Sequence, residues 1–178
     1  SEIESVVGVI PNINRLARVL RDKGGVVIWV GMTAGSKGES RWRLYHDHFF
    51  TPEKGANHRD QLSPEHSGHA FHKDLDIRDG DPIVWKNRFS PFIAGASNIE
   101  DVLQPRGIDS LIITGTATNM CCESTARDAM MLNFRTVMVS DALAAYSDAE
   151  HAAALMNFYT VFGDVQTIDE TIASLAHG

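Results

Sequence analysis

Two adjacent cysteines lie where a buried strand is expected to give way to a helix. The apolar run 111–114 is followed by Gly115 and a turn of small residues, and a helical pattern begins near Asn119. Cys121 therefore falls in the first turn of a helix at the carboxyl end of a strand, the edge at which parallel α/β sheets bind ligands. The helix N-terminus favours a thiolate there, and its free N–H groups can stabilise an oxyanion. We interpret Cys121 as a candidate nucleophile and Cys122 as a packing residue; the alternative is that both are small core side chains.

A basic segment supplies the second group that could take part in chemistry. Lys86 and Arg88 directly follow the apolar run 82–85. If that strand is parallel to the strand before Cys121, Lys86 lies on the same rim of the sheet as the thiol. An ammonium group at that position can hold a thiolate and a nearby carboxylate in their charged forms. The alternative interpretation of Lys86 is a solvated loop lysine.

Strand-like and helix-like segments alternate along the chain. Short runs rich in Val and Ile, bounded by Gly, Asp or Pro, are typical of strands buried on both faces. These runs are residues 26–30, 82–85, 111–114, 136–139 and, more weakly, 161–167. Helical patterns cover residues 10–23, 98–104, 120–132, 148–159 and 170–176. The alternation predicts an α/β fold with a mainly parallel sheet, in a single domain that spans residues 1–178.

The segment 32–81 has no convincing strand pattern and is predicted to form a long loop or lid. Six of the eight histidines fall in it, and His46 and His48 flank Asp47. A His-x-His pair in a polar loop is more often solvated than ligating, so no metal site is predicted. Several aromatic residues in this segment are expected to form a lid, a subunit contact or a small satellite core: Trp42, Tyr45, Phe49 and Phe50.

The composition excludes several classes of protein. Apolar residues make up 43% of the chain and charged residues 22%, which is ordinary for a globular domain. The formal net charge is -7 and the basic residues are scattered, which argues against a nucleic-acid partner. No apolar run approaches the roughly 20 residues of a membrane helix, so no membrane partner is expected. Two adjacent cysteines cannot form a disulfide framework and are not a Cys-x-x-Cys redox pair, which favours a reducing, cytoplasmic compartment.

Two motifs resemble those of one family. Residues 115–129 resemble the signature of the isochorismatase-like cysteine hydrolases, and residues 86–92 resemble that family's lysine motif. The pattern is most similar to ureidoacrylate amidohydrolase-like members. The resemblance implies a three-layer α/β/α sandwich that hydrolyses a C–N amide bond through a Cys–Asp–Lys triad, and we expect a homo-oligomer without a cofactor.

The resemblance also assigns roles to individual residues. Cys121 is expected to be the nucleophile and Lys86 the triad lysine, and the backbone N–H groups of Ala117 and Cys121 are expected to form the oxyanion hole. A cis non-proline peptide bond is expected before Ala117. The side chains expected to contact a small amide or ureido substrate are those of Arg88, Thr118 and Asn119.

One part of the family pattern is missing from these residues. The family's aspartate ends a central strand that precedes the first long helix, whereas here residues 1–6 lead straight into that helix. Asp47 and Asp60 lie in the long loop, and no spacing supports either as a replacement. We therefore expect the first strand and the triad aspartate to be absent from residues 1–178 and to be supplied by a longer polypeptide. The alternative is a binding or scaffold protein of the same fold that lacks catalytic activity.

A comparison within the family also argues against a metal. Nicotinamidase-like relatives hold a metal through an Asp-x-His motif that follows a strand. The residues after Val30 lack that motif. The resemblance therefore predicts a metal-independent reaction.

Overall fold

The computed structural model describes residues 6–35 and 42–176. The described strands are β1 (Trp29–Met32), β2 (Ile83–Lys86), β3 (Ser110–Thr116), β4 (Arg135–Ala144) and β5 (Asp164–Gln166). All of their pairings are parallel, and they form a two-stranded sheet, β1-β2, and a three-stranded sheet, β3-β4-β5. The predicted parallel α/β architecture is confirmed, but within the described residues no pairing joins β1 to β3.

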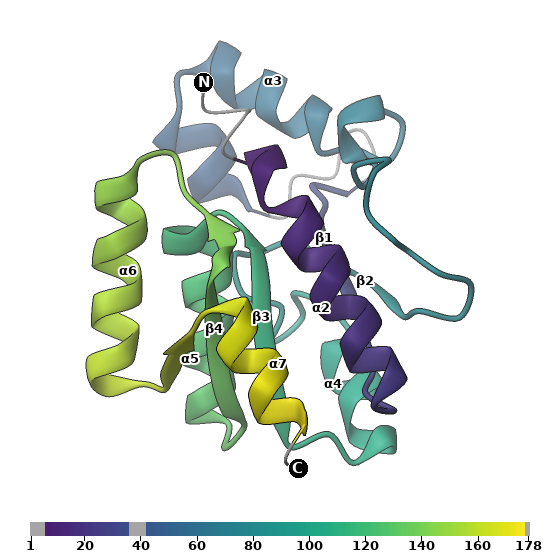
Figure 1. The fold of residues 1–178 in the computed structure, drawn as a ribbon. Helices are drawn as coiled ribbons and strands as arrows, with labels where there is room; N and C mark the ends of the chain where they lie inside the picture. The colour runs from purple at the N-terminus through teal and green to yellow at the C-terminus, as the bar shows by residue number, and fades with distance from the viewer. Residues whose placement is uncertain (1–5, 36–41, 177–178) are drawn as a thin grey trace.

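Helices cover both faces of the three-stranded sheet. The α-helices are α2 (Ile10–Asp22), α3 (Pro52–Gln61), α4 (Ile99–Leu103), α5 (Glu123–Met131), α6 (Asp148–Val161) and α7 (Ile168–Ala176). Short turns of 3-10 or π geometry are η1 (Leu44–Phe49), η2 (Ser67–His69), η3 (Gln104–Arg106) and η4 (Thr118–Cys122). Figure 1 shows α7 in front of β3 and β4 with α2 beside it, and both helices pack on the same face of β4, while α5 and α6 pack against β4 from the other side. None of the described helices is long and apolar enough to cross a membrane.

Strand β4 supplies the centre of both cores. Met138 packs with Phe158 of α6 on one face, and the neighbouring Val139 packs with Leu16 of α2 and Ile168 of α7 on the other. Successive side chains of a strand point to opposite faces, so a run that is buried throughout needs a helical layer on each side. This packing explains why residues 137–139 are apolar without alternation.

The two-stranded sheet is fastened to α2 by polar contacts. The Arg21 guanidinium donates hydrogen bonds to the carboxylates of Asp76 and Asp81, and the indole N–H of Trp29 donates to Asp81. Partial burial acts to raise the pKa of Asp81, but the hydrogen bonds from Arg21, the Arg78 backbone N–H and Trp29 outweigh it and keep that pKa below its usual value. The charged form of Asp81 therefore links α2, β1 and the turn that leads into β2.

The segment between β1 and β2 contains helical structure that the sequence pattern did not predict. Thr51 caps α3 by accepting a hydrogen bond from the Lys54 N–H, and Pro52 occupies the first position of the helix. Helix α3 lies against η1 at Gly55, where a Cβ atom would collide with the His46 carbonyl oxygen. Only glycine permits this close approach, which packs η1 and α3 into one unit above the strands (Figure 1).

Candidate active site

The turn after β3 presents the candidate nucleophile. The Thr116–Ala117 peptide bond is cis, as the resemblance implied. The Ala117 carbonyl accepts hydrogen bonds from the N–H groups of Met120 and Cys122, each at 3.2 Å. The bond from Cys122 spans five residues and gives η4 its π geometry. The Cys121 N–H is not among the donors to this carbonyl. An oxyanion hole formed by the Ala117 and Cys121 N–H groups stays a prediction.

The structure brings the two predicted catalytic residues together. The Lys86 Nζ atom lies 3.1 Å from the Cys121 Sγ atom and donates to the Arg88 carbonyl at 2.9 Å. Lys86 is only 4% exposed, and none of the ion pairs between described residues includes it. A buried ammonium group is costly without a counter-charge, and the neighbouring sulfur is the atom that can supply one as a thiolate.

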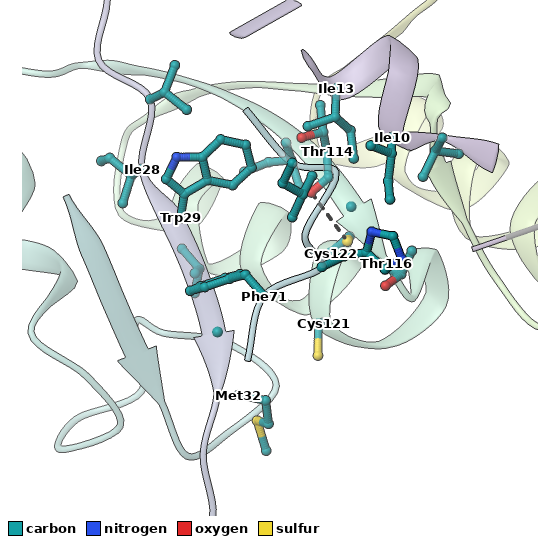
Figure 2. A pocket seen from close by; sticks show the side chains of 18 of the residues that line it. Ile10, Ile13, Ile28, Trp29, Met32, Phe71, Thr114, Thr116, Cys121 and Cys122 are labelled. Carbon is teal, nitrogen blue, oxygen red and sulfur yellow. Dashed lines mark hydrogen bonds between the residues drawn. The ribbon is translucent and has the colours of Figure 1, made fainter. Parts of the chain in front are cut away.

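The two cysteines differ in their surroundings. Cys122 is buried with Ala126, Met138 and Phe158, which confirms the prediction that it is a packing residue. Burial raises the pKa of Cys122 and keeps it as a thiol, and the adjacent Cys121 adds to this effect. Figure 2 shows the Cys122 sulfur facing the Thr114 carbonyl, 3.9 Å away, while the Cys121 side chain points elsewhere, toward the side of Met32.

The three side chains predicted to contact substrate have different environments. The Arg88 guanidinium lies over the ring of Trp42, 5.1 Å from its centroid. The Asn119 Oδ1 atom is buried and has no hydrogen-bond partner among the described residues. Thr118 is fully buried, and its Oγ1 atom lies 2.9 Å from Nδ1 of His151. His151 lies in the predicted helix 148–159, but it was not among the residues predicted for the site.

Tyr45 marks the side of the site formed by the segment between β1 and β2. Burial raises the pKa of Tyr45, and the nearby Tyr146 and Cys121 add to the increase. The Tyr45 ring contacts Trp42 and Phe89, with centroid distances of 4.5 and 5.3 Å. These rings form an aromatic cluster that includes Phe89, three residues after Lys86; the role of the segment as a lid stays a prediction.

The two acidic residues considered as replacements for the triad aspartate lie elsewhere. Asp47 pairs with the guanidinium of Arg59. Asp60 is exposed, and neither carboxylate contacts Lys86.

A slot separates the two sheets and opens on the candidate site. It has a volume of about 490 Å³ and is lined by both sheets, by α2 and by residues 68–72 (Figure 2). Side chains along it include Ile10, Ile13, Ile28, Trp29, Met32, Phe71, Thr114 and Thr116, with Lys86 and Cys121 also in its lining.

The edges of the slot carry backbone groups oriented for strand pairing. The Trp29 N–H donates to the Pro82 carbonyl, just before β2, and the Thr33 N–H donates to the Lys86 carbonyl at the end of β2. Backbone groups of alternate residues in a strand point to opposite sides, so those of Val30 and Met32 face the slot. The slot therefore has a polar edge suited to a further strand and mostly apolar walls.

Comparison with known proteins identifies the family and the fold. The model of the Isochorismatase domain matches residues 2–170. The chain belongs to the isochorismatase family. It is 31% identical to the ureidoacrylate amidohydrolase RutB of Variovorax paradoxus, over 98% of this chain and 72% of that protein. It is 32% identical to the RutB protein of Pseudomonas savastanoi, over 95% of this chain and 71% of that protein.

Solved structures of the isochorismatase family show the same architecture. A cysteine hydrolase from Pseudomonas syringae pv. phaseolicola superposes with a TM-score of 0.86 and 25% identity, covering 98% of this chain and 83% of that one. The N-carbamoylsarcosine amidase of Thermoplasma acidophilum superposes with a TM-score of 0.73 and 21% identity, covering 93% and 85%. The predicted family and three-layer α/β/α fold are confirmed, and the chain is an isochorismatase-family hydrolase.

Proposed function

We propose that this chain belongs to a cytoplasmic amidohydrolase that cleaves a C–N bond of a small amide or ureido compound, with Cys121 as the nucleophile. The observation that carries the proposal is the 3.1 Å contact between Lys86 Nζ and Cys121 Sγ at the mouth of the slot. The thiolate attacks the substrate carbonyl carbon, and the carbonyl electron pair moves to the oxygen, which faces the N–H groups of Ala117 and Cys121. The C–N bond then breaks, the nitrogen leaves with a proton, and water hydrolyses the thioester.

The leaving nitrogen needs a proton donor, which we assign to a carboxyl group on a strand that fills the slot. Three observations support this assignment: the slot is bounded by strand edges, it has apolar walls, and it ends at Lys86, which has no carboxylate partner among the described residues. A carboxylate at that end would take the thiol proton, return it to the nitrogen, and balance the buried ammonium charge. The strand would also join the two sheets into one.

The identity of the relatives supports the substrate class. The names of the two RutB relatives state that they act on ureidoacrylate, and the structural neighbour from Thermoplasma is named for N-carbamoylsarcosine. All three names describe compounds with a carbonyl carbon bonded to nitrogen. We therefore propose ureido acids, carbamoyl compounds and simple carboxamides as the substrates to test.

The proposed activity is tested by measuring ammonia release from a panel of these three compound types. We expect at least one ureido or carbamoyl compound to be hydrolysed, and we expect activity to persist after treatment with EDTA because the thiolate supplies the nucleophile. Cys122→Ser is the matched control for Cys121→Ser. Loss of activity in EDTA with recovery on addition of zinc, iron or manganese would contradict the metal-independent mechanism.

The proposed strand is tested by comparing two polypeptides. One begins at Ser1, and the other also contains the residues encoded immediately upstream of it. We expect the longer polypeptide to unfold at a higher temperature and to hydrolyse amides, because the added strand fills the slot and supplies the carboxyl group. Equal unfolding temperatures and equal turnover would refute the strand. A longer polypeptide that is stable but inactive would instead favour a scaffold protein of the same fold.

We also propose that the protein assembles with copies of itself. Helix α6 is apolar on its outer side, where Met156, Tyr159 and Val161 are each more than 60% exposed. Exposed apolar residues grouped on one element are typical of subunit contacts. Light scattering is expected to give a mass that is a multiple of the chain's mass, and replacement of Met156 and Tyr159 by Glu should reduce it to one copy.

A further inference from the structure

A buried hydrogen bond joins the nucleophile turn to a helix that is distant in the sequence. Thr118, in η4, has no exposed surface, and its Oγ1 atom lies 2.9 Å from Nδ1 of His151 in the first turn of α6. A buried hydroxyl that loses its partner bears the full cost of its desolvation, so this contact constrains both groups. This contact does not involve Lys86, and neither Thr118 nor His151 lines the slot.

The start of α6 holds His151 in place. Ser147 caps the helix: its hydroxyl accepts from the Glu150 N–H at 3.2 Å and donates to the Glu150 carboxylate at 2.8 Å. The His151 N–H donates to the Ser147 carbonyl at 3.0 Å. The imidazole therefore projects from a helical turn that is fixed at both its backbone and its cap.

Thr118 is held at two points, and the predicted oxyanion donors lie on either side of it. Its carbonyl accepts a hydrogen bond from the Glu123 N–H, and its hydroxyl contacts His151. Ala117 immediately precedes Thr118, and Cys121 follows in the same turn. Fixing the Thr118 side chain therefore limits how far the Ala117 and Cys121 N–H groups can reorient.

We propose that His151 is a positioning residue of the active site: through the Thr118 hydroxyl it holds the turn whose N–H groups stabilise the oxyanion. The inference rests on the proposed role of Cys121 as nucleophile. In this arrangement the Thr118 side chain does not contact the substrate. It holds the backbone of the turn in place, and that backbone binds the substrate. A donor displaced by about 1 Å can cost two orders of magnitude in rate, so a remote contact of this kind affects catalysis without touching the substrate.

The inference is tested with two reactions of Cys121 that require different parts of the site. Alkylation by iodoacetamide forms a C–S bond at a saturated carbon and expels iodide, so it depends on the thiolate but not on the oxyanion hole. Addition of propionaldehyde forms a C–S bond at the carbonyl carbon, while the carbonyl electron pair moves to oxygen and that oxygen takes the thiol's proton. The resulting hemithioacetal oxygen lies where the oxyanion would, and protection against alkylation measures the aldehyde's dissociation constant.

The matched variants are His151→Leu and His151→Asn. The two replacement side chains have similar shapes, but only Asn places a hydrogen-bonding atom the same number of bonds from Cα as Nδ1. We expect His151→Leu to alkylate within about twofold of the unmodified rate but to bind propionaldehyde about tenfold more weakly, and His151→Asn to bind it nearly as well as the parent protein. His48→Leu, at an exposed histidine, is expected to change neither reaction.

A second pair of variants keeps the test informative if His151→Leu fails to fold. Thr118→Val removes the hydroxyl and Thr118→Ser retains it, and we expect Thr118→Val to weaken aldehyde binding as His151→Leu does. The double variant Thr118→Val/His151→Leu should bind the aldehyde no more weakly than either single variant, because both substitutions remove the same contact. Unchanged aldehyde binding in His151→Leu or Thr118→Val, or equal losses in both reactions, would overturn the inference. Neither assay requires amide turnover, so a protein that hydrolyses no amide would refute the proposed function and leave this test intact.

Discussion

The two candidate catalytic residues come from halves of the molecule that are stabilised in different ways. Cys121 follows the three-stranded sheet, whose central strand is packed on both faces by helices. Lys86 ends the two-stranded sheet, which is fastened by the Arg21–Asp81 contact and by stacked rings such as His69 on Trp85, 3.9 Å between centroids. The nucleophile is therefore placed by a strand that is packed on both faces. The lysine follows Val84, which packs against Ile99 and Leu103 of α4, and its sheet is held in addition by these polar and aromatic contacts.

The nucleophile and the lysine therefore depend on different contacts for their positions. The thiol, its turn and His151 all belong to β3, η4 and α6, which contact one another directly. The ammonium group and the aromatic cluster at Tyr45 belong to β2 and to the segment between β1 and β2. We infer that the oxyanion hole is the more rigid part of the site, and that the position of Lys86 is more sensitive to what occupies the slot.

The largest expected effect is the difference between the two adjacent cysteines. Cys121→Ser should lower amide hydrolysis about 10³-fold or more, because a hydroxyl beside Lys86 is a far weaker nucleophile than a thiolate. Cys122→Ser should change the rate by less than about threefold and should instead lower the unfolding temperature, since it places a hydroxyl in the apolar core. Ammonia release and thermal unfolding of both variants check this. Similar rates for the two variants would remove the proposed distinction.

Replacing the lysine should separate activity from stability. Lys86→Met is expected to lower the rate about 10²-fold or more while leaving the unfolding temperature unchanged or higher, because it removes a buried charge that has no carboxylate partner among the described residues. Lys73→Met, at an exposed lysine, is the control. A Lys86→Met variant with near-native turnover would exclude the catalytic role of the ammonium group.

Two phenylalanine substitutions compare the packing of the two halves. Phe158 is fully buried between α6 and β4, and Phe158→Ala should lower the free energy of unfolding by about 3–5 kcal/mol. Phe71 lines the slot and contacts Trp85 with a centroid distance of 5.2 Å, so Phe71→Ala should cost about 1–2 kcal/mol. Urea unfolding measures both. Equal losses would mean that the lysine half is packed as tightly as the nucleophile half.

Acidification should weaken the lysine half first. His46 and His58 approach within 3.4 Å through their Nδ1 atoms, and burial lowers the pKa of each, with the charge of His58 lowering that of His46 further. In the unfolded chain these groups titrate near a pKa of about 6.5. Below about pH 6.5 the unfolded state binds more protons than the folded state, so the free energy of unfolding falls as the pH decreases. Above about pH 6.5 these two histidines do not change it.

The pH effect is measured as the change in unfolding temperature between pH 7.5 and pH 5.5. We expect His58→Gln to show a smaller decrease than the parent protein, because it removes one of the two titrating rings, and His48→Gln to behave like the parent. Identical decreases in all three proteins would show that the buried pair does not control the response.

The sequence predicted the nucleophile half more accurately than the lysine half, for physical reasons. The runs at 111–114 and 136–139 each contain three consecutive apolar residues because both faces of those strands are covered, so their pattern is strong. The run at 26–30 predicted a strand that instead pairs from Trp29 to Met32. Residues 26–28 line the slot, and their apolar character reflects that environment and not pairing with β2.

The helices of the segment between β1 and β2 gave almost no periodic signal. Helix α3 has one buried residue, Gly55, and a glycine contributes nothing to an apolar stripe. The pattern Thr51-Pro52 was the available clue, since a threonine cap followed by proline is typical of a helix start. The contact of His151 with Thr118 joins residues 33 positions apart and depends on how α6 packs on the turn, which no local pattern encodes.

The most direct test of the central claim is to trap the acyl group that Cys121 is proposed to carry. The protein is mixed with a ureido or carbamoyl substrate, quenched in acid, and its peptides are mapped by mass spectrometry. The account predicts that the acyl mass appears on the peptide containing Cys121, is absent in Cys121→Ser, and disappears as hydrolysis proceeds. Hydrolysis that continues in Cys121→Ser, or an acyl group found on Cys122, would contradict it.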